Sequence, residues 1–162
     1  MNKVYLGLGT NLGDRKRNLL AATEQIKAKI GNVVKSSSVY ETAPWGFEAD
    51  TDFLNMVVEV ETKLAPSDVL KMILAIESHL GRERTQDRYS SRIIDIDILF
   101  YDDLILEEKS LKIPHRLIHE RRFVLAPLNE ISPELIHPVL NKSISVLLEQ
   151  CRDRTKVLRL KL

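Results

Sequence analysis

Residues 92–100 constrain this chain more than any other segment, because their apolar run, Arg-Ile-Ile-Asp-Ile-Asp-Ile-Leu-Phe, is interrupted by two aspartates. β-Branched and other apolar residues without Gly or Pro predict a buried β-strand. Asp95 and Asp97 are two residues apart, so a strand directs both carboxylates to the same face. Neighbouring carboxylates repel each other and are costly among apolar side chains, and a bound cation removes both problems. The pattern indicates a Mg²⁺–phosphate site, since Mg²⁺ often takes one or two carboxylates together with substrate phosphates; the alternative is an edge strand with a solvated polar face.

An arginine-rich segment leads directly into this strand. Residues 81–92 have no apolar periodicity, which predicts a loop. The arginines of this loop are Arg82, Arg84, Arg88 and Arg92. A guanidinium is permanently charged and binds phosphate oxygens through paired N–H groups, and arginines beside a carboxylate-bound metal stabilise charge in phosphoryl transfer. The alternative is a solvated loop in which Glu83 and Asp87 offset two of the arginines.

The composition limits the class of protein. With 162 residues, 44% hydrophobic and 29% charged, the chain is expected to form one globular domain over residues 1–162. A formal net charge of +1 gives no bulk field that would favour nucleic acid or an anionic membrane, so anion recognition must be local. Cys151 is the only cysteine, which excludes an intramolecular disulfide and a multi-cysteine zinc site. No signal peptide or membrane-length apolar run is found, so we expect a cytoplasmic protein.

Hydrophobic periodicity predicts the order strand, helix, strand, strand, helix, strand. The elements are a strand over 4–8, a helix from Arg15 capped by Asp14, strands over 33–41 and 53–62, a helix from Pro66 that ends at Gly81, and the aspartate strand. This is the order of the ferredoxin-like α+β fold, βαββαβ, whose antiparallel sheet carries both helices on one face and leaves the other for a site. Apolar spacing assigns Leu20 and Leu74 to the buried helix faces. The predicted C-terminal additions are helices over 122–129 and 143–149 and a strand over 157–160.

Residues 7–14 are rich in glycine and connect the first strand to the first helix. The segment lacks the Gly-Lys-Ser/Thr of a Walker loop and is not a full dinucleotide fingerprint. Two interpretations remain open. The helix N-terminus lies near a phosphate, or the segment is a tight turn in which Gly and Asn relieve backbone strain.

A second basic cluster follows Pro114. It consists of His115, Arg116, Arg121 and Arg122. A histidine in this setting can donate a hydrogen bond to a phosphate, whereas nothing nearby matches a zinc-ligand spacing. His119 and His137 are interpreted as ordinary surface or core histidines.

Aromatic and amide residues surround a third candidate region, over residues 42–55. It contains Thr42, Pro44, Trp45, Phe53 and Asn55. Two aromatic rings and an amide suit a flat heteroaromatic ligand, which would stack on the rings and hydrogen-bond at its edge. The alternative is that Phe53 belongs to the core and Trp45 packs within a loop.

Taken together, these segments resemble the 6-hydroxymethyl-7,8-dihydropterin pyrophosphokinase (HPPK) family over nearly the full length of the chain. The most specific motif is Arg-x-x-Asp-x-Asp at residues 92–97, preceded by Gly-Arg-Glu-Arg at 81–84. The other matching motifs are Leu-Gly-Thr-Asn-Leu-Gly at 8–13, Tyr-Glu-Thr-Ala-Pro at 40–44, Phe-Leu-Asn at 53–55, Pro-His at 114–115 and Arg-Arg-Phe-Val-Leu-Ala-Pro-Leu at 121–128.

The resemblance implies an enzyme of folate biosynthesis that transfers pyrophosphate from ATP to 6-hydroxymethyl-7,8-dihydropterin and releases AMP. It implies that Asp95 and Asp97 bind two Mg²⁺ ions, and that Arg82 and Arg92 stabilise charge during transfer. The residues at ATP-contacting positions of the family are Glu77, Arg84, Ile98, Lys112, His115, Arg116 and Arg121. Those at pterin-contacting positions are Thr42, Ala43, Pro44, Trp45, Phe53, Asn55, Tyr89 and Phe123, with Tyr89 where the family often has Trp. We expect a monomer whose partners are these two small molecules, with no nucleic acid and no membrane.

Two other functions fit parts of the pattern. A Mg²⁺-dependent nucleotidyltransferase also pairs a glycine-rich N-terminal segment with a two-aspartate metal site, but it would release pyrophosphate instead of AMP. A non-catalytic ferredoxin-like module would bind nucleic acid or a regulatory ligand. The strand-face aromatics of RNA-binding modules are missing, and paired aspartates would repel phosphates without a metal.

Overall fold

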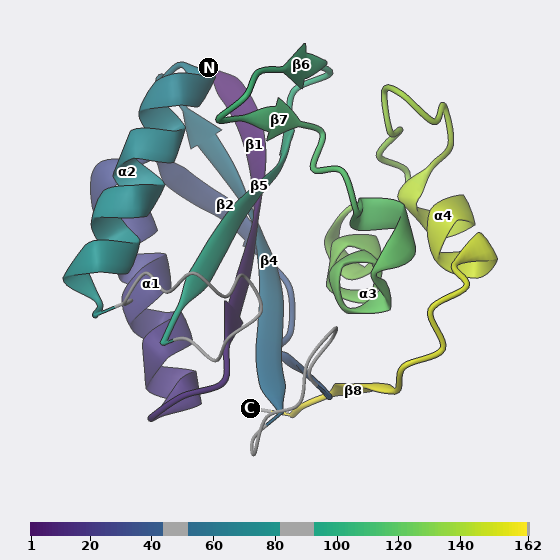
Figure 1. Cartoon of the computed structure of the whole chain (residues 1–162), viewed down its shortest axis with the longest axis horizontal. Helices are drawn as coiled ribbons and strands as arrows, with labels where there is room; N and C mark the ends of the chain where they lie inside the picture. Colours follow the sequence, from purple (N-terminus) through teal and green to yellow (C-terminus); the bar gives the residue numbers. More distant parts are fainter. Residues whose placement is uncertain (44–51, 82–92, 162) are drawn as a thin grey trace.

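A computed structural model describes residues 1–43, 52–81 and 93–161 of the chain. Within these residues the main sheet has strands β1 (Asn2–Thr10), β2 (Asn32–Ser36), β3 (Tyr40–Thr42), β4 (Phe53–Thr62), β5 (Asp95–Tyr101) and β8 (Val157–Arg159). The strand order is β5-β1-β4-β3-β8, with β2 also paired to β4, and every pairing is antiparallel (Figure 1). A separate hairpin joins β6 (Leu106–Glu107) to β7 (Lys112–Ile113).

The helices are α1 (Arg15–Lys29), α2 (Pro66–His79), α3 (Arg122–Ile131) and α4 (Ile144–Gln150), with a 3₁₀ turn at Ile118–Glu120. Along the chain the core elements follow the predicted order βαββαβ, so the α+β, ferredoxin-like prediction is confirmed. The N-cap of α1 is as predicted, because the side chain of Asp14 accepts a hydrogen bond from the Arg17 amide. No helix in the described parts of the chain is long and apolar enough to cross a bilayer.

One predicted strand is divided in two. The sequence predicted a single strand over 33–41, but the structure separates β2 from β3 around Ser37. The Ser37 amide donates to the Val57 carbonyl at 2.9 Å, and its hydroxyl accepts from the Val57 amide at 2.9 Å. Next to it, Ser38 donates its amide and hydroxyl to the Glu130 carboxylate at the end of α3. Serine side chains therefore replace ladder bonds at this point and interrupt the strand.

The first sheet face carries α1 and α2 and holds the larger core (Figure 1). Its strand contributions include Leu6, Leu8, Ile96 and Ile98. The prediction that Leu20 and Leu74 belong to this core is wrong, because they are 64% and 38% exposed. On α1 the buried positions are Leu19, Ala22 and Ile26, and Leu20 lies about 100° around the helix from Leu19.

The second sheet face divides into two halves. The apolar half is formed by Tyr5, Val57, Leu99 and Phe100, which pack with α3 and α4. The polar half is formed by Gly7, Gly9, Asn55, Asp95 and Asp97, which are paired across β1, β4 and β5. The second face is therefore available to a site, as expected, but only in its polar half. The C-terminal helices cover one half, since their apolar stripes need a partner surface.

Candidate active site

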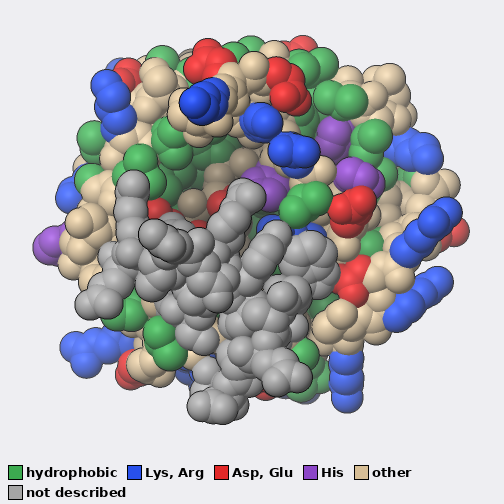
Figure 2. Space-filling model, viewed as in Figure 1, with side chains coloured by type: hydrophobic (Ala, Val, Ile, Leu, Met, Phe, Trp, Pro, Cys, Tyr) green, Lys and Arg blue, Asp and Glu red, His purple; other side chains and the backbone are tan. Residues whose placement is uncertain are grey.

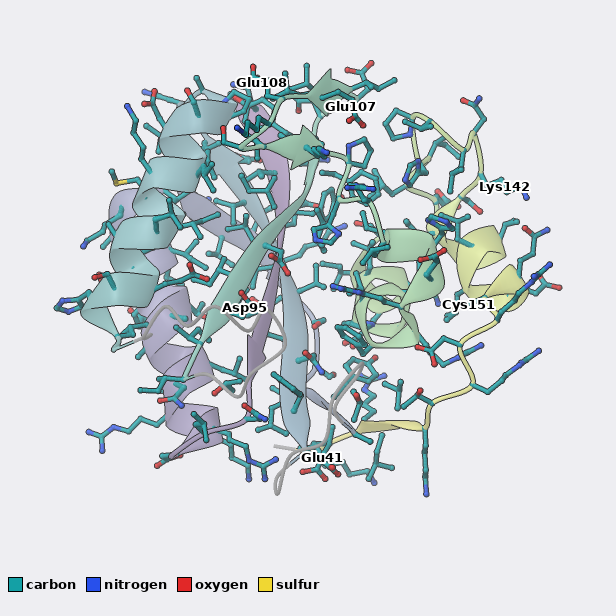
Figure 3. All side chains as sticks on the ribbon, in the orientation of Figure 1. Glu41, Asp95, Glu107, Glu108, Lys142 and Cys151 are labelled. Carbon is teal, nitrogen blue, oxygen red and sulfur yellow. The ribbon has the colours of Figure 1, made fainter. Side chains whose placement is uncertain are left out.

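Asp95 and Asp97 are half-buried on β5 and alternate with Ile96 and Ile98 of the core, so they lie on the sheet face opposite α1 and α2. Figure 3 labels Asp95 on this strand. Between them, Ile96 belongs to the core under the helices, which fixes the alternation of the strand. The register pairs Asp95 with Gly9 and Asp97 with Gly7. Two carboxylates thus stand on one face, as the sequence predicted, beside two residues without side chains. Figure 2 shows acidic side chains next to a histidine near the centre of the molecule in the same view.

The glycine-rich segment contributes to the site in a way that the sequence analysis missed. Gly7 and Gly9 belong to β1 itself, and only Gly13, with φ +69°, forms the turn. A Cβ built on Gly9 would lie 2.9 Å from Oδ1 of Asn55, so any side chain there would displace this amide. Gly7 and Gly9 are two residues apart, as are Asp95 and Asp97. This equal spacing was the signal in the sequence that could have predicted their pairing. The phosphate at the α1 N-terminus stays a prediction.

Glu77 on α2 is 3% exposed, and its Oε2 accepts a hydrogen bond from the Ile96 amide at 2.8 Å. β5 is the edge strand on this side of the sheet, so its outward backbone amides need partners from elsewhere. The Glu77 carboxylate supplies one, directly between the two aspartates. Its observed contact therefore fixes the position of β5, and its predicted contact with ATP stays a prediction.

Ile98 is 6% exposed and its side chain packs in the core under α1 and α2. Backbone groups alternate in direction along a strand, so Ile98 directs its amide and carbonyl to the same edge as Ile96. Any contact with a ligand at this position would therefore use the backbone.

His115 is held against β5 by its backbone. Its amide donates to the Leu99 carbonyl at 3.0 Å, at the point where an irregularity shifts the β1–β5 register. Its Nδ1 accepts from the Leu117 amide at 3.2 Å, so the neutral ring carries its proton on Nε2. Burial lowers the pKa of His115 to about 4, with a further lowering by the charge of Arg121 and an opposing effect of Asp95. At neutral pH His115 is therefore an uncharged Nε2–H donor.

Arg121 and Phe123 lie together at the start of α3. The guanidinium carbon of Arg121 is 5.6 Å from the centroid of the Phe123 ring, which is cation–π geometry. Of the other predicted ATP contacts, Lys112 is half-buried on β7 and Arg116 is exposed. The structure thus brings a predicted ATP-side residue, Arg121, against a predicted pterin-side residue, Phe123.

Asn55 and Thr42 are buried on β4 and β3, at 6% and 3% exposure. Thr42 is paired with Phe53 across the two strands, and its hydroxyl donates to the Ala43 carbonyl at 2.9 Å. Nδ2 of Asn55 has no hydrogen-bond partner among the described residues. A buried amide nitrogen rarely stays unsatisfied, so it is a donor suited to a ligand.

Six of the predicted site residues lie outside the described residues. They are Pro44, Trp45, Arg82, Arg84, Tyr89 and Arg92. Among the described residues there is no group of three or more histidine, cysteine and acidic side chains that could hold a metal ion. The aspartate pair is therefore a two-carboxylate candidate, and substrate oxygens would have to complete the coordination of a metal.

Comparison with known proteins identifies the family of the chain. Residues 5–133 match the family described as 7,8-dihydro-6-hydroxymethylpterin-pyrophosphokinase (HPPK). The chain is 42% identical over 144 residues to the 2-amino-4-hydroxy-6-hydroxymethyldihydropteridine pyrophosphokinase of Aquifex aeolicus, covering 89% of each chain. It is 45% identical over 138 residues to the protein of the same name from Methylorubrum extorquens, covering 84% of this chain and 86% of that protein.

Solved structures show the same fold. The wild-type HPPK-DHPS of Plasmodium falciparum with pteroate superposes with a TM-score of 0.76 at 20% sequence identity. The match covers 92% of this chain but 44% of that longer one. At 20% identity this similarity shows a shared fold only. The family match and the bacterial relatives, in contrast, cover most of the sequence. The chain belongs to the HPPK family.

Proposed function

We propose that this chain transfers the pyrophosphoryl group of ATP to 6-hydroxymethyl-7,8-dihydropterin in folate biosynthesis and releases AMP. Relatives at 42% and 45% identity over most of both lengths are named as pyrophosphokinases of this pterin. The observation that carries the proposal within the molecule is the polar half of the second sheet face. It combines two carboxylates, two glycines and a buried amide with an unpartnered donor.

Asp95 and Asp97 are proposed to hold Mg²⁺. The donor set fits, because Mg²⁺ favours carboxylate oxygens and commonly completes its coordination with substrate phosphates and water. The family resemblance predicts two ions. When bound, Mg²⁺ would neutralise the phosphate charge and help the hydroxymethyl group to lose its proton.

The ATP side is proposed to lie around β5, β7 and the start of α3. Here the neutral His115 would donate its Nε2–H to a phosphate oxygen and Arg121 would add a positive charge. Lys112 and Arg116 would add charge at the periphery, and Glu77 would hold the backbone of β5 in place. Arg82, Arg84 and Arg92 complete the proposed set from outside the described residues.

The pterin side is proposed to lie on β3, β4 and α3. The unpartnered Nδ2 of Asn55 would bind an acceptor at the edge of the ring, and Phe53 and Phe123 would contact its faces. Thr42 and Ala43 would line the end of β3. Pro44, Trp45 and Tyr89 are the remaining proposed contacts, and they lie outside the described residues.

The reaction itself needs no covalent intermediate. The hydroxymethyl oxygen attacks the β-phosphorus of ATP, the bond to the α-phosphate oxygen breaks, and AMP leaves. No side chain in the polar half is assigned as a general base, so the protein acts by positioning the two substrates and stabilising charge. The chain is proposed to work as a single domain, as a monomer and in the cytoplasm.

The direct test incubates the protein with ATP, Mg²⁺ and 6-hydroxymethyl-7,8-dihydropterin and identifies the small product. AMP in a 1:1 ratio to pterin diphosphate is expected, as that is the stoichiometry of pyrophosphoryl transfer. Release of pyrophosphate would instead indicate a nucleotidyltransferase, and the absence of turnover would favour a binding module. Omission of Mg²⁺ with added chelator tests the metal separately.

A further inference from the structure

The first turn of α1 touches both sides of the proposed site from behind. Nη1 of Arg15 donates to Oε2 of Glu41 at 3.0 Å and to the Asp52 carbonyl at 2.9 Å. Glu41 lies on β3, and Asp52 directly precedes β4. One guanidinium nitrogen therefore connects the two strand ends. These ends carry the Thr42–Phe53 pair of the proposed pterin side.

Asn18, at the end of the same first turn of α1, makes the corresponding contacts to the other side. Its Nδ2 donates to the Leu12 carbonyl at 2.7 Å, to Oγ1 of Thr10 at 3.1 Å and to the Ile93 carbonyl at 3.3 Å. Carbonyl oxygens only accept, so the nitrogen of this amide must face them. The hydroxyl of Thr10 donates to the same Ile93 carbonyl. Ile93 lies two residues before Asp95, at the entrance to β5.

The sequence explains why both contacts start from one turn. Gly13 adopts φ +69°, which reverses the chain after β1, and Asp14 then caps α1 through the Arg17 amide. Arg15 and Asn18 are three residues apart, so they lie on the same side of the helix. This turn follows β1, in which Gly9 is paired with Asp95 and Asn55.

We propose that the first turn of α1 is a shared positioning element, in which Arg15 sets the pterin side and Asn18 sets the aspartate side. The inference rests on the proposed function for the meaning of these sides. Neither residue is assigned a contact with substrate, and both act through the backbone or side chains of strand ends. The Arg15–Glu41 pair is about 30% exposed at each side chain, so its expected contribution to stability is small and its effect is on position.

The test uses Arg15→Ala and Asn18→Asp, with Lys16→Ala as a control at an exposed neighbouring position. Asn18→Asp keeps the shape of the side chain but removes the donated hydrogen bonds. We expect Arg15→Ala to raise the KM for the pterin by about tenfold while kcat and the KM for ATP stay within about twofold of the parent. Asn18→Asp should lower kcat by about tenfold and raise the Mg²⁺ concentration needed for half-activity, with the pterin KM unchanged. The proposal would be overturned if both variants changed the pterin KM, kcat and the Mg²⁺ requirement equally. It would also be overturned if their effects were no larger than those of Lys16→Ala.

A second measurement separates this inference from the proposed reaction. Hydrogen exchange should become faster in peptides covering 40–43 and 52–55 for Arg15→Ala, and in the peptide covering 93–97 for Asn18→Asp, each without change in the other region. This result does not depend on turnover, so it holds or fails even if the parent protein makes no AMP. Uniform acceleration in both variants would mean general destabilisation and would contradict separate anchoring. Rescue of the pterin KM by Arg15→Lys, which keeps the charge, would support the link to Glu41.

Discussion

The apolar and polar halves of the second sheet face are built from the same three strands but serve different purposes. Moving along β1, Tyr5 is followed by Gly7 and Gly9. β4 and β5 change in the same direction, from Val57 to Asn55 and from Phe100 and Leu99 to Asp97 and Asp95. In the apolar half the large side chains are covered by α3 and α4. In the polar half the same ladder carries carboxylates, an amide and no side chain at two positions.

The two halves differ in the size and charge of their side chains, and they meet where an irregularity shifts the β1–β5 register. Burying large apolar side chains stabilises the fold, whereas paired carboxylates and an unsatisfied amide oppose it. The apolar half therefore offsets the cost of the polar half on one continuous sheet. It follows that substitutions in the two halves should separate stability from activity.

The largest expected effect is on activity in the polar half. Asp97→Ala should lower turnover by at least about 10³-fold, because it removes one of two proposed Mg²⁺ ligands. The free energy of unfolding without Mg²⁺ should stay equal or rise, since like charges on one strand face repel each other. AMP production and thermal melting by circular dichroism measure the two effects.

Asp103→Ala is the matched control, because it removes an exposed carboxylate from the turn that follows the same strand. It should leave turnover near that of the parent. Turnover of Asp97→Ala within about tenfold of the parent would contradict the metal assignment.

Substitutions in the apolar half should lower stability and leave kcat nearly unchanged. Phe100 is 1% exposed and makes edge-to-face contacts with Tyr5 at 6.2 Å and with His137 at 5.6 Å between ring centroids. Phe100→Ala should lower the free energy of unfolding by about 3–5 kcal/mol, with kcat per folded molecule changed by less than about threefold. Urea denaturation and assays below the transition measure these quantities, with Phe100→Leu as the milder control. A loss of kcat as large as that of Asp97→Ala would remove the separation between the halves.

Much of this arrangement could be predicted from the sequence, because it depends on local patterns. The boundaries of β4, the Asp14 cap of α1 and the shared face of Asp95 and Asp97 follow from alternation, capping preference and spacing. The division of β2 from β3 could not be predicted. It depends on Ser38 meeting Glu130, which is 92 residues away.

The site was predicted less completely, because it too depends on contacts between residues that are far apart in the sequence. The resemblance placed Glu77 near ATP, but its bond to the Ile96 amide requires α2 and β5 to be packed together. For Gly9 the sequence left a turn and a phosphate-binding helix N-terminus open and did not predict its pairing with Asn55, which lies on another strand. Contacts between distant segments are set by packing, which one sequence does not display. The six predicted site residues outside the described residues stay predictions.

A methyl group should have different effects at the two glycines of the polar half. In Gly9→Ala the new Cβ would lie 2.9 Å from Oδ1 of Asn55, so the amide must shift. We expect the pterin KM to rise by about tenfold with a small change in stability. Gly7→Ala is the matched control, because its Cβ would meet Leu99 at 3.5 Å, an ordinary contact. Steady-state kinetics with varied pterin test this, and an equal KM for both variants would contradict the role of Gly9.

The smallest expected effect concerns the neutral His115 at the border of the two halves. Its pKa is about 4 in the folded protein and its ordinary value is 6.5, so the unfolded chain binds a proton first as the pH falls. The stability from this residue is complete above pH 6.5 and decreases toward pH 4. Between pH 7.5 and 6.0 the loss should be on the order of 1 kcal/mol. The lowered pKa of His137 acts in the same direction, whereas Glu130 and Asp153 have ordinary values of 4.5 and 3.8, below this window.

His115→Gln isolates the contribution of His115, because glutamine does not titrate. The difference in unfolding free energy between pH 7.5 and 6.0, measured by urea denaturation, should be smaller in this variant by about 1 kcal/mol. His79→Gln, at an exposed position at the end of α2, serves as the control for removing a histidine. An unchanged pH dependence in His115→Gln would mean that the ring is not held neutral by burial. His115 could then be charged when it meets a phosphate, and the ATP side would carry one more positive charge than the structure assigns to it.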